Sequence, residues 1–488
     1  MGGISNLLNI GWSALSTHRV ATEVAGHNIA NAATPGYNRQ QVETSNRQGV
    51  QTGRGMLGNG VEALGVRNLQ DEMMEGRLIM AQGDEGYYYG RARVLDAAET
   101  AVGIGEDDGV AKSMADLFSA FKALSNNPSG MAERQQVISS TERFCYETKR
   151  VRTALEDTRA SLNTEIGGLT DDLQQKLREI ASLNKQIRTA EVGGVATAND
   201  LRDHRALLAR QAGEMVGART STDQEGNLNL SLVGDAGGGV LVEGNNCAIL
   251  ESIADPANNG LKVPTVTGME RSDGTRVLWS ISAQKALDPS CSGILGGLLS
   301  ARDTEVKGAI TSLDTLAFDL ATEINRVHSL GLGLQDDTHR NLIDPAGLAT
   351  VDGAAARLAL DPTMIGHPEH VAAGADQVLP TGALPGDNTN ALLLADVANT
   401  NLSGGMNAST YWRTKVSDFG NSVSEAKQNY EVNRSAVSQL ENLRQSTAGV
   451  SIDEEMIQLT MSQRAFEAAS KLIQVGDQLL LTVIGLKV

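Results

Sequence analysis

The sequence predicts a mainly α-helical protein with β-rich insertions, an α+β chain whose terminal helices pair with each other. Three patterns support this fold class. Both ends of the 488-residue chain carry an apolar seam with a 3.5-residue period, long middle segments have helical periodicity, and one central segment alternates strictly. We expect a coiled-coil-like inner domain from the terminal helices, a helical bundle in the middle and a β-rich outer domain.

The first predicted element is a helix over residues 4–33. Its seam steps alternately by four and three residues, as in a coiled coil, through Ile4, Leu8, Gly11, Leu15, His18, Thr22, Ala25 and Ile29. Thr34-Pro35-Gly36-Tyr37 follows. Because proline disfavours helix in the residue before it and Pro-Gly suits the centre of a type II turn, the helix is expected to end here.

Helices are predicted in the middle of the chain wherever apolar residues recur at helical spacing. Four such segments are 88–102, 111–124, 132–150 and 155–187. Gly193-Gly194 then breaks the helical pattern, and the next predicted helix begins with Asn199 as its N-cap and ends at Met215. The last two segments are 293–329 and 411–445. The segment from Asn227 to Val233 alternates polar and apolar side chains, so strands are predicted from about 218 to 285. Residues 331–410 are predicted to form loops and short strands.

The last predicted element is a helix of about 35 residues that nearly reaches Val488. Ser451 to Glu454 matches a capping box, and acidic residues in the first turn suit the helix dipole. The seam runs through Ile452, Met456, Leu459, Phe466, Ala469, Ile473, Gly476, Leu480 and Val483. Chain ends fray unless they are tied down. Two matching terminal seams are therefore expected to pair with each other or with neighbouring copies.

These elements divide the chain into discontinuous domains. Residues 1–40 and 450–488 are predicted to form a terminal helical polymerisation domain, and 41–216, 293–335 and 411–449 a mainly helical middle domain. Residues 217–292 are predicted to form the β-rich outer domain, and 336–410 an insertion of loops and short strands.

Charge and composition exclude several classes of function. The chain has 41 basic and 59 acidic residues, a net charge of −18, so nucleic acid is not an expected partner. The longest apolar run, Leu479 to Leu486, is far shorter than the roughly 20 residues that span a bilayer, so membrane insertion is not expected. Three distant cysteines, Cys145, Cys247 and Cys291, indicate neither a disulfide framework nor a zinc site. The N-terminus lacks the pattern of a cleaved signal peptide.

No motif makes a good case for catalysis, a cofactor or a metal. The GxGxxG match from Gly53 to Gly58 leads into a strand-like segment, so a hairpin loop is expected. The two histidines of His367-Pro-Glu-His370 are candidates for a pair of metal ligands. Pro368 disfavours the helix that would align them, and no further ligand is evident, so a surface loop is expected. Adjacent acidic residues are expected to be solvated, at Asp107-Asp108, Asp171-Asp172, Asp336-Asp337 and Glu454-Glu455. Cys145 is expected to be packed rather than reactive.

The two ends of the chain resemble a known family. His27 to Gln40 resembles the N-terminal signature of the bacterial flagellar rod, hook and hook-associated proteins. Asp453 to Leu459, with Gln463-Arg-Ala-Phe466 and Lys471-Leu-Ile473, resembles the C-terminal signature. The resemblance is closest to the members that form the first layer between hook and filament, on these residues: Tyr37-Asn-Arg-Gln40, the 155–187 helix, Asn199 to Asp203, Ser292 to Leu298, Arg302-Asp303 and Gly386-Asp-Asn388.

This resemblance implies a structural, extracellular protein of the flagellum, exported by the flagellar type III apparatus without a cleaved signal. It implies a ring or helical layer of copies of the chain, in contact with hook protein and a second junction protein (hook-associated protein 3), and an export chaperone. The implied polymer interface is Ile4, Leu8, Leu15, Ala25, Asn28, Ile29, Asn31, Pro35, Gly36, Tyr37, Met456, Leu459, Phe466, Ile473, Leu480 and Val483.

Alternatives remain open at this point. A hook protein or distal rod protein of the same family is the first, and a flagellum-exported cell-wall hydrolase is a remote one, because no segment offers a carboxylate in a cleft. A secreted adhesin or effector would leave the C-terminal seam unexplained. Since isolated helices are marginally stable in water, we also expect the terminal helices to be disordered in the monomer.

Overall fold

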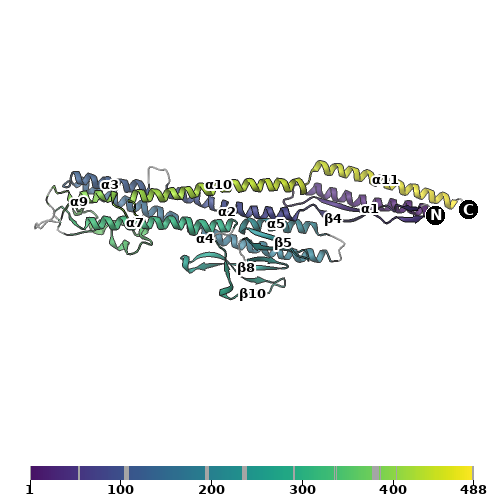
Figure 1. Cartoon of the computed structure of the whole chain (residues 1–488), viewed down its shortest axis with the longest axis horizontal. Coiled ribbons are helices and arrows are strands. Elements are labelled where there is room, and N and C mark those ends of the chain that lie inside the picture. The colour runs from purple at the N-terminus through teal and green to yellow at the C-terminus, as the bar shows by residue number, and fades with distance from the viewer. Residues whose placement is uncertain are drawn as a thin grey trace.

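The chain is elongated in its computed structural model, with both termini at one end and helices α3 and α9 at the other (Figure 1). The structure describes residues 2–52, 55–103, 109–192, 197–233, 239–288, 292–334, 336, 338–375, 384, 386–402 and 404–485. The mainly helical fold with a β-rich part confirms the predicted fold class. No helix among these residues is both long and apolar enough to cross a membrane.

The end that carries the termini is built from two helices and a β-hairpin. Helix α1 (Gly2–Asn31) packs along α11 (Ile452–Gly485), and strands β1 (Gln40–Asn46) and β4 (Val61–Asn68) cover another face of α1. The sequence analysis assigned 41–68 to the middle domain. These strands lie along α1 because Gly60 allows close approach: a Cβ there would meet Ser13 and come 3.3 Å from the Cα of Ile10.

The hairpin has a smaller hairpin at its tip. Strands β2 (Val50–Thr52) and β3 (Gly55–Leu57) pair antiparallel, which agrees with a hairpin rather than a dinucleotide loop for the GxGxxG match. The first two residues of that match, Gly53 and Arg54, lie outside the described residues.

The middle of the molecule is a bundle of long helices. Helix α10 (Ala408–Ala448) runs along α2 (Glu72–Val102), and α4 (Met131–Ala190) contacts α3 (Val110–Asn126) and α5 (Asn199–Val216). Helices α6 (Ile294–Ser300) and α7 (Lys307–His328) are joined by a π-helical turn, Ala301–Val306. Fully buried side chains such as Phe121, Phe144 and Leu155 form its core.

Two helices are longer than predicted. The 132–150 and 155–187 segments form the single 60-residue helix α4, because nothing between them breaks the helix and the buried stripe continues through Val151 and Leu155. The first half of α2 was missed because it is rich in glycine. These glycines allow close helix contacts: a Cβ at Gly83 would lie 2.7 Å from the Cα of Gly217, and one at Gly86 would overlap the carbonyl oxygen of Glu214.

Two predicted helix caps also differ. The N-cap of α5 is Ala198, and the side chain of Asn199 instead donates to the carbonyl of Val66, 2.9 Å away. At α11 only half of the capping box forms: the backbone N–H of Glu454 lies 3.5 Å from Ser451 Oγ. The Glu454 carboxylate pairs with Arg39 instead of capping the backbone, because an ion pair is available to it.

The β-rich part projects from one side of the bundle (Figure 1). An antiparallel meander joins β5 (Ala218–Thr222), β6 (Leu228–Leu232), β7 (Val240–Glu243), β8 (Asn246–Asp255), β9 (Leu261–Glu270) and β10 (Arg276–Leu278), with β11 (Lys285–Ala286) also on β9. Leu230 of the alternating segment is buried, as the alternation predicts. The fully buried Arg302 of the π turn donates to the carbonyl of Lys262 and so ties the sheet to the bundle.

The segment 331–410 is not only loops and short strands. It contains strands β12 (Gly331–Leu332) and β13 (Gly374–Ala375), the short helix α8 (Ala354–Arg357), several 3-10 turns and helix α9 (Thr389–Asp396). Helix α9 was missed because it is only eight residues long and follows a glycine- and proline-rich stretch. It packs on α3 at the end of the molecule far from the termini.

Candidate polymerisation interface

The terminal helices α1 and α11 form an antiparallel pair, and the buried side chains of α11 between them become smaller toward the chain ends. Every seventh residue of α11 is buried, and side-chain size falls along this row from Glu455 through Ser462 and Ala469 to Gly476. A Cβ at Gly476 would lie 2.8 Å from Leu8 Cδ2, and one at Gly11 2.7 Å from Ile473 Cγ1. Glycine at both positions therefore lets the two backbones approach closely.

The structure brings most of the predicted seam residues to this contact. Ala25 is buried, and the following are half-buried: Ile4, Leu8, Leu15, Ile29, Leu459, Phe466, Ile473 and Leu480. Ile452, Met456 and Val483 are exceptions, with exposed fractions of 53%, 50% and 38%. They lie beside the row of buried residues on α11 and not in it. None of the three contributes much to the pairing of α1 with α11.

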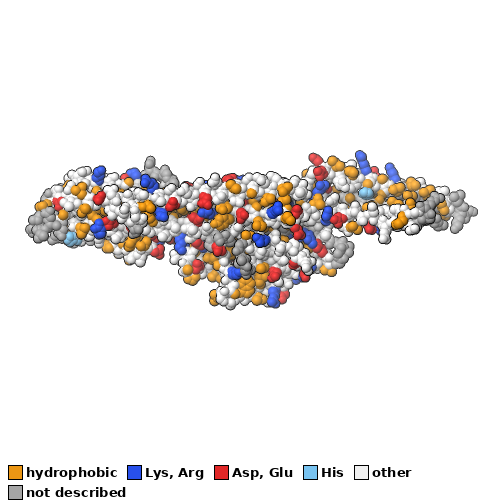
Figure 2. All heavy atoms as spheres, in the orientation of Figure 1, with side chains coloured by type: hydrophobic (Ala, Val, Ile, Leu, Met, Phe, Trp, Pro, Cys, Tyr) orange, Lys and Arg blue, Asp and Glu red, His pale blue; other side chains and the backbone are white. Residues whose placement is uncertain are grey.

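Helix α11 carries a second apolar seam that the sequence analysis missed. Its members step by 4, 7, 4, 3 and 4 residues and are all exposed: Ile457, Met461, Ala468, Leu472, Val475 and Leu479. Hydrophobic side chains accordingly gather on the surface of this end of the molecule (Figure 2). Large exposed apolar patches typically mark sites of association. We call these six residues the outer seam.

Asn28 is the centre of the joint where α1 meets the rest of the chain. It is 1% exposed, and its amide donates to the carbonyl of Gln40 (2.9 Å) and to Glu455 Oε2 (3.0 Å). Its Oδ1 accepts from the backbone N–H of Gln40 (3.0 Å) and from the Tyr37 hydroxyl (2.8 Å). One side chain thus ties together α1, the turn after it, β1 and α11.

The predicted turn after α1 has the expected form. Tyr37 N–H donates to the carbonyl of Thr34 (3.2 Å), and Gly36 has φ +81°, the left-handed value that the third position of a type II turn requires. Burial, with nearby Asp200, Asp203 and Glu455, raises the pKa of Tyr37 above its ordinary value, so the hydroxyl remains a donor. Pro35 is exposed, and the Asn31 side chain makes only local bonds, donating to the carbonyl of His27 and accepting from the hydroxyl of Thr34.

Charged residues lock the first turn of α11 to the strand that follows α1. Arg39 donates from Nε to Glu455 Oε1 (2.7 Å) and from a terminal nitrogen to Glu454 Oε2 (2.9 Å). Glu455 is 2% exposed, so the prediction of a merely solvated acidic pair is wrong here. A signal for this pair was available, because four residues back from Leu459 the seam reaches Glu455, whereas the sequence analysis placed Met456 there.

A second set of bonds anchors the joint to α5 of the middle bundle. Asp203 accepts from the backbone and side chain of Asn38 (3.0 and 2.7 Å) and from Asn68 (3.0 Å). Burial raises the pKa of Asp203 despite these three bonds. Gln40 donates to Asp200 (2.9 Å), so the motif from Asn199 to Asp203 contacts the joint along its length.

A polar cavity of about 790 Å³ opens beside this joint. The turn at Pro35 and Gly36 lines one side, and Arg210, Glu214 and Arg444 line the other. Side-chain hydrogen bonds and ion pairs around this cavity therefore stabilise the joint, and among the described residues no continuous hydrophobic core fills it.

The other chemical candidates are structural. Burial raises the pKa of Cys145 to about 12 and that of Cys247 to about 11, so both thiols are protonated at neutral pH. Asp171 and Asp172 are exposed, as expected, whereas Asp336 is 9% exposed and paired with Arg340 (2.7 Å), which corrects the prediction of a solvated acid. The prediction for Cys291, for the pair Asp107-Asp108 and for Asp337 falls outside the described residues.

Comparisons with known proteins agree with the terminal signatures. The family model for the flagellar hook-associated protein FlgK helical domain matches residues 95–342, about half of the chain. The chain belongs to the FlgK family. It is a hook-associated axial component of the flagellum at the junction of hook and filament. Models for the flagellar basal body rod FlgEFG protein C-terminal region and the flagella basal body rod protein match residues 444–486 and 8–38.

Individual FlgK-family relatives match over nearly the full length. Flagellar hook-associated protein 1 of Bacillus subtilis (strain 168) is 25% identical, over 97% of this chain and 96% of its own. The protein of the same name from Escherichia coli (strain K12) is 25% identical, over 99% and 100%. The solved structure of the flagellar hook junction protein FlgK from Burkholderia pseudomallei covers 77% of this chain and all of its own, with 15% identity and a TM-score of 0.66. That structure shares the fold.

Proposed function

We propose that this chain forms the layer between hook and filament by polymerising through its terminal helices. The observation that carries this proposal is the outer seam of α11, an apolar row left exposed after α11 has paired with α1. Six apolar residues on one line of one helix keep much of their surface exposed in the single chain. A neighbouring copy, or an adjoining axial subunit, would bury them.

The size of the outer seam suits an assembly contact. Five of its members are large, and they are 40–62% exposed in the single chain. Full burial of such a side chain contributes about 1.5–3 kcal/mol, so burial of the exposed part contributes about 1 kcal/mol each. One seam would then supply roughly 5 kcal/mol per subunit. Each subunit of a closed layer has two neighbours and so makes this contact twice. The two contacts together can hold a ring, whereas one contact of this strength would not hold a pair of subunits.

The arrangement of charge supports an inner position for the terminal helices. Residues 1–48 carry a net charge of +1 and residues 449–488 one of −2, so the remaining chain carries −17. Weakly charged ends of neighbouring copies can pack closely around a common axis. The acidic bundles and sheets of neighbouring copies repel one another least when they point away from that axis. We infer that the layer contacts hook protein on one side and the second junction protein, hook-associated protein 3, on the other.

We also propose that the protein leaves the cell through the flagellar type III apparatus, held by an export chaperone, and has no catalytic activity. Terminal helices that become ordered only on assembly would keep the exported chain from polymerising early. The buried, protonated thiols support a structural role.

The sequence alone left open a hook or distal rod protein, and the rod-protein models match only the two ends of the chain. The match of the FlgK helical domain to residues 95–342 favours the junction. The two candidates differ in the polymer: hook and rod proteins would form a long tube of one subunit, and a junction protein would form a thin layer.

Leu472→Asp tests the outer seam without touching the pairing of α1 with α11. The variant places a charge in the contact between copies, and we expect cells that carry it to export the protein but to lack attached filaments. Gln474→Asp is the matched control, two residues along on an exposed face away from both seams. Normal filaments with Leu472→Asp would overturn the assignment of the outer seam.

A further inference from the structure

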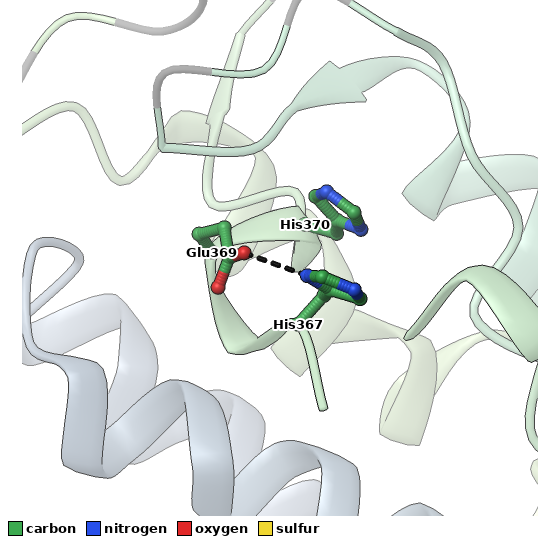
Figure 3. A group of neighbouring side chains, drawn as sticks. All are labelled: His367, Glu369 and His370. Atoms are coloured by element: carbon green, nitrogen blue, oxygen red, sulfur yellow. Dashed lines mark hydrogen bonds and ion pairs between the residues drawn. The ribbon is translucent and has the colours of Figure 1, made fainter. Parts of the chain in front are cut away.

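A short turn at the end of the molecule far from the termini brings two histidines face to face. His367 precedes the 3-10 turn Pro368–His370, and residues three apart in such a turn are eclipsed. The two imidazole rings are stacked, with centroids 4.7 Å apart and planes inclined by 18° (Figure 3). Pro368, which excluded helical spacing in the sequence, is the first residue of this turn. The sequence analysis therefore missed how closely the two rings lie.

Hydrogen bonds fix which nitrogen of each ring carries the proton. His370 Nδ1 lies 2.7 Å from the carbonyl oxygen of Thr363 and His367 Nδ1 2.9 Å from Glu369 Oε1. Both oxygens can only accept, so in the neutral imidazole each Nδ1 is the donor. The Nε2 atom of His370 then keeps its lone pair, and an imidazole whose other nitrogen is hydrogen-bonded in this way is typical of a metal ligand. At His367 the ligand atom is Nδ1, because it faces Glu369 Oε1, and a bound ion would displace the proton between these two atoms.

Hydrogen bonds from neighbouring segments hold the backbone of the turn in place. Arg134, which is 2% exposed, donates to the carbonyls of Glu369 (3.3 Å) and Val371. The backbone N–H of Leu334 also donates to the Glu369 carbonyl, at 2.8 Å. The backbone that carries the three side chains is thus anchored to α4 and to the strand region after α7. A backbone anchored in this way holds ligands in place more accurately than a free loop does.

We propose that His367, Glu369 and His370 bind one divalent transition-metal ion of the kind that prefers imidazole, with Zn²⁺ as the representative. Each residue offers one ligand atom, and the three atoms lie within 4.8 Å of one another. Ligands of a tetrahedral Zn²⁺ are about 3.4 Å apart, given bonds of about 2.1 Å. Rotation of the exposed His367 ring and of the Glu369 carboxylate closes that difference.

The ligand chemistry and the exposure both suit such an ion. Two neutral imidazoles and a carboxylate are ligands of Zn²⁺, Ni²⁺ and Cu²⁺, whereas Ca²⁺ and Mg²⁺ prefer oxygen alone. The side chains of His367 and Glu369 are 54% and 39% exposed, so water can fill the remaining coordination positions. The bound ion would connect the two ends of the turn and so make this end of the middle domain more rigid.

Calorimetric titration of the full-length chain with Zn²⁺ tests this proposal. The chain should carry no histidine tag and should first be stripped of metal by a chelator. We expect one equivalent of Zn²⁺ to bind. With Cu²⁺ as a second probe, paramagnetic resonance should show coupling to the nitrogens of two imidazoles.

Variants assign the binding to this turn. His367→Ala or His370→Ala should weaken Zn²⁺ binding at least tenfold, and the double variant should abolish it, while the melting curve in chelator stays that of the parent. His204→Gln is the matched control, because His204 is also exposed and faces a carboxylate, Glu179, at 3.6 Å. Stoichiometric Zn²⁺ binding that survives in the double variant would overturn the proposal. So would the absence of one-to-one binding to the parent chain.

Discussion

Asn28→Ala should abolish incorporation into the flagellum while leaving the middle bundle folded. The substitution removes four hydrogen bonds at once: two with the backbone of Gln40, one with the Tyr37 hydroxyl and one with the buried Glu455 carboxylate. Both backbone groups of Gln40 would then be left without these partners in a residue that is 8% exposed. Buried polar groups that lose their partners cost more than the bond itself contributed.

The magnitude follows from the kinds of bond lost. Three neutral bonds contribute about 1 kcal/mol each and the bond to a carboxylate about 2, a loss of roughly 5 kcal/mol. If the terminal pair becomes ordered before assembly, this cost lowers its stability. If it becomes ordered on assembly, the cost raises the concentration needed to polymerise, on the order of a thousandfold at 1.4 kcal/mol per factor of ten. Assembly is lost in either case.

The assay is the fraction of cells with attached filaments when a deletion strain expresses each variant. Asn31→Ala is the matched control, since Asn31 is the same residue type on the same helix but makes only local bonds: it donates to the His27 carbonyl (3.1 Å) and accepts from the Thr34 hydroxyl (3.2 Å). It should cost about 1 kcal/mol and leave filaments attached. A normal number of filaments with Asn28→Ala, at matched expression, would refute the role of this joint.

Three further predictions concern the terminal pair and the bundle. Leu480→Asp, which places a charge in the seam between α1 and α11, should block incorporation without changing the melting of the middle bundle, whereas Gln474→Asp, on an exposed face away from both seams, should be tolerated; normal filaments with Leu480→Asp would contradict the seam. Limited proteolysis of the purified monomer should remove about 30–50 residues from each end, and full protection of both ends in a verified monomer would show that the helices are ordered before assembly. Burial lowers the pKa of His328 from 6.5 to about 4, and its Nε2 accepts from the backbone N–H of Ala372 (3.0 Å). The unfolded histidine takes up a proton near pH 6.5 and the folded one only near pH 4, so this stabilisation is present above pH 6.5 and lost as pH falls toward 4. Denaturant unfolding should show a loss of about 3 kcal/mol over that window, which His328→Gln should remove; an unchanged slope in that variant would contradict it.

Local periodicity predicted the helices whose buried faces are continuous. The 3.5-residue seams found α1 and α11 and their pairing, because that period is set by contact between two helices. The same search missed the outer seam, since it stopped at the first apolar row on α11. Leu472 and Val475 belong to a row that the sequence also contains. The glycine-rich start of α2 was missed because glycine has low helix propensity, and only packing against α5 and α6 explains it.

The joint could not be predicted from spacing, because its partners are far apart in the chain. Asn28 and Glu455 are separated by 427 residues, and Asn38 and Asp203 by 165. The resemblance to a family identified the segments that carry these residues but not which of their side chains meet. Only the fold shows that Asn28 bonds across the joint while Asn31, three residues later, bonds to near neighbours in the chain.

The most direct test of a junction role is a clean deletion of the gene, with negative-stain microscopy of the cells and an assay of flagellin in the medium. We predict complete hooks without filaments and flagellin lost to the medium. Cells without hooks would place the protein in the hook or rod, and normal filaments with normal motility would contradict the junction role altogether.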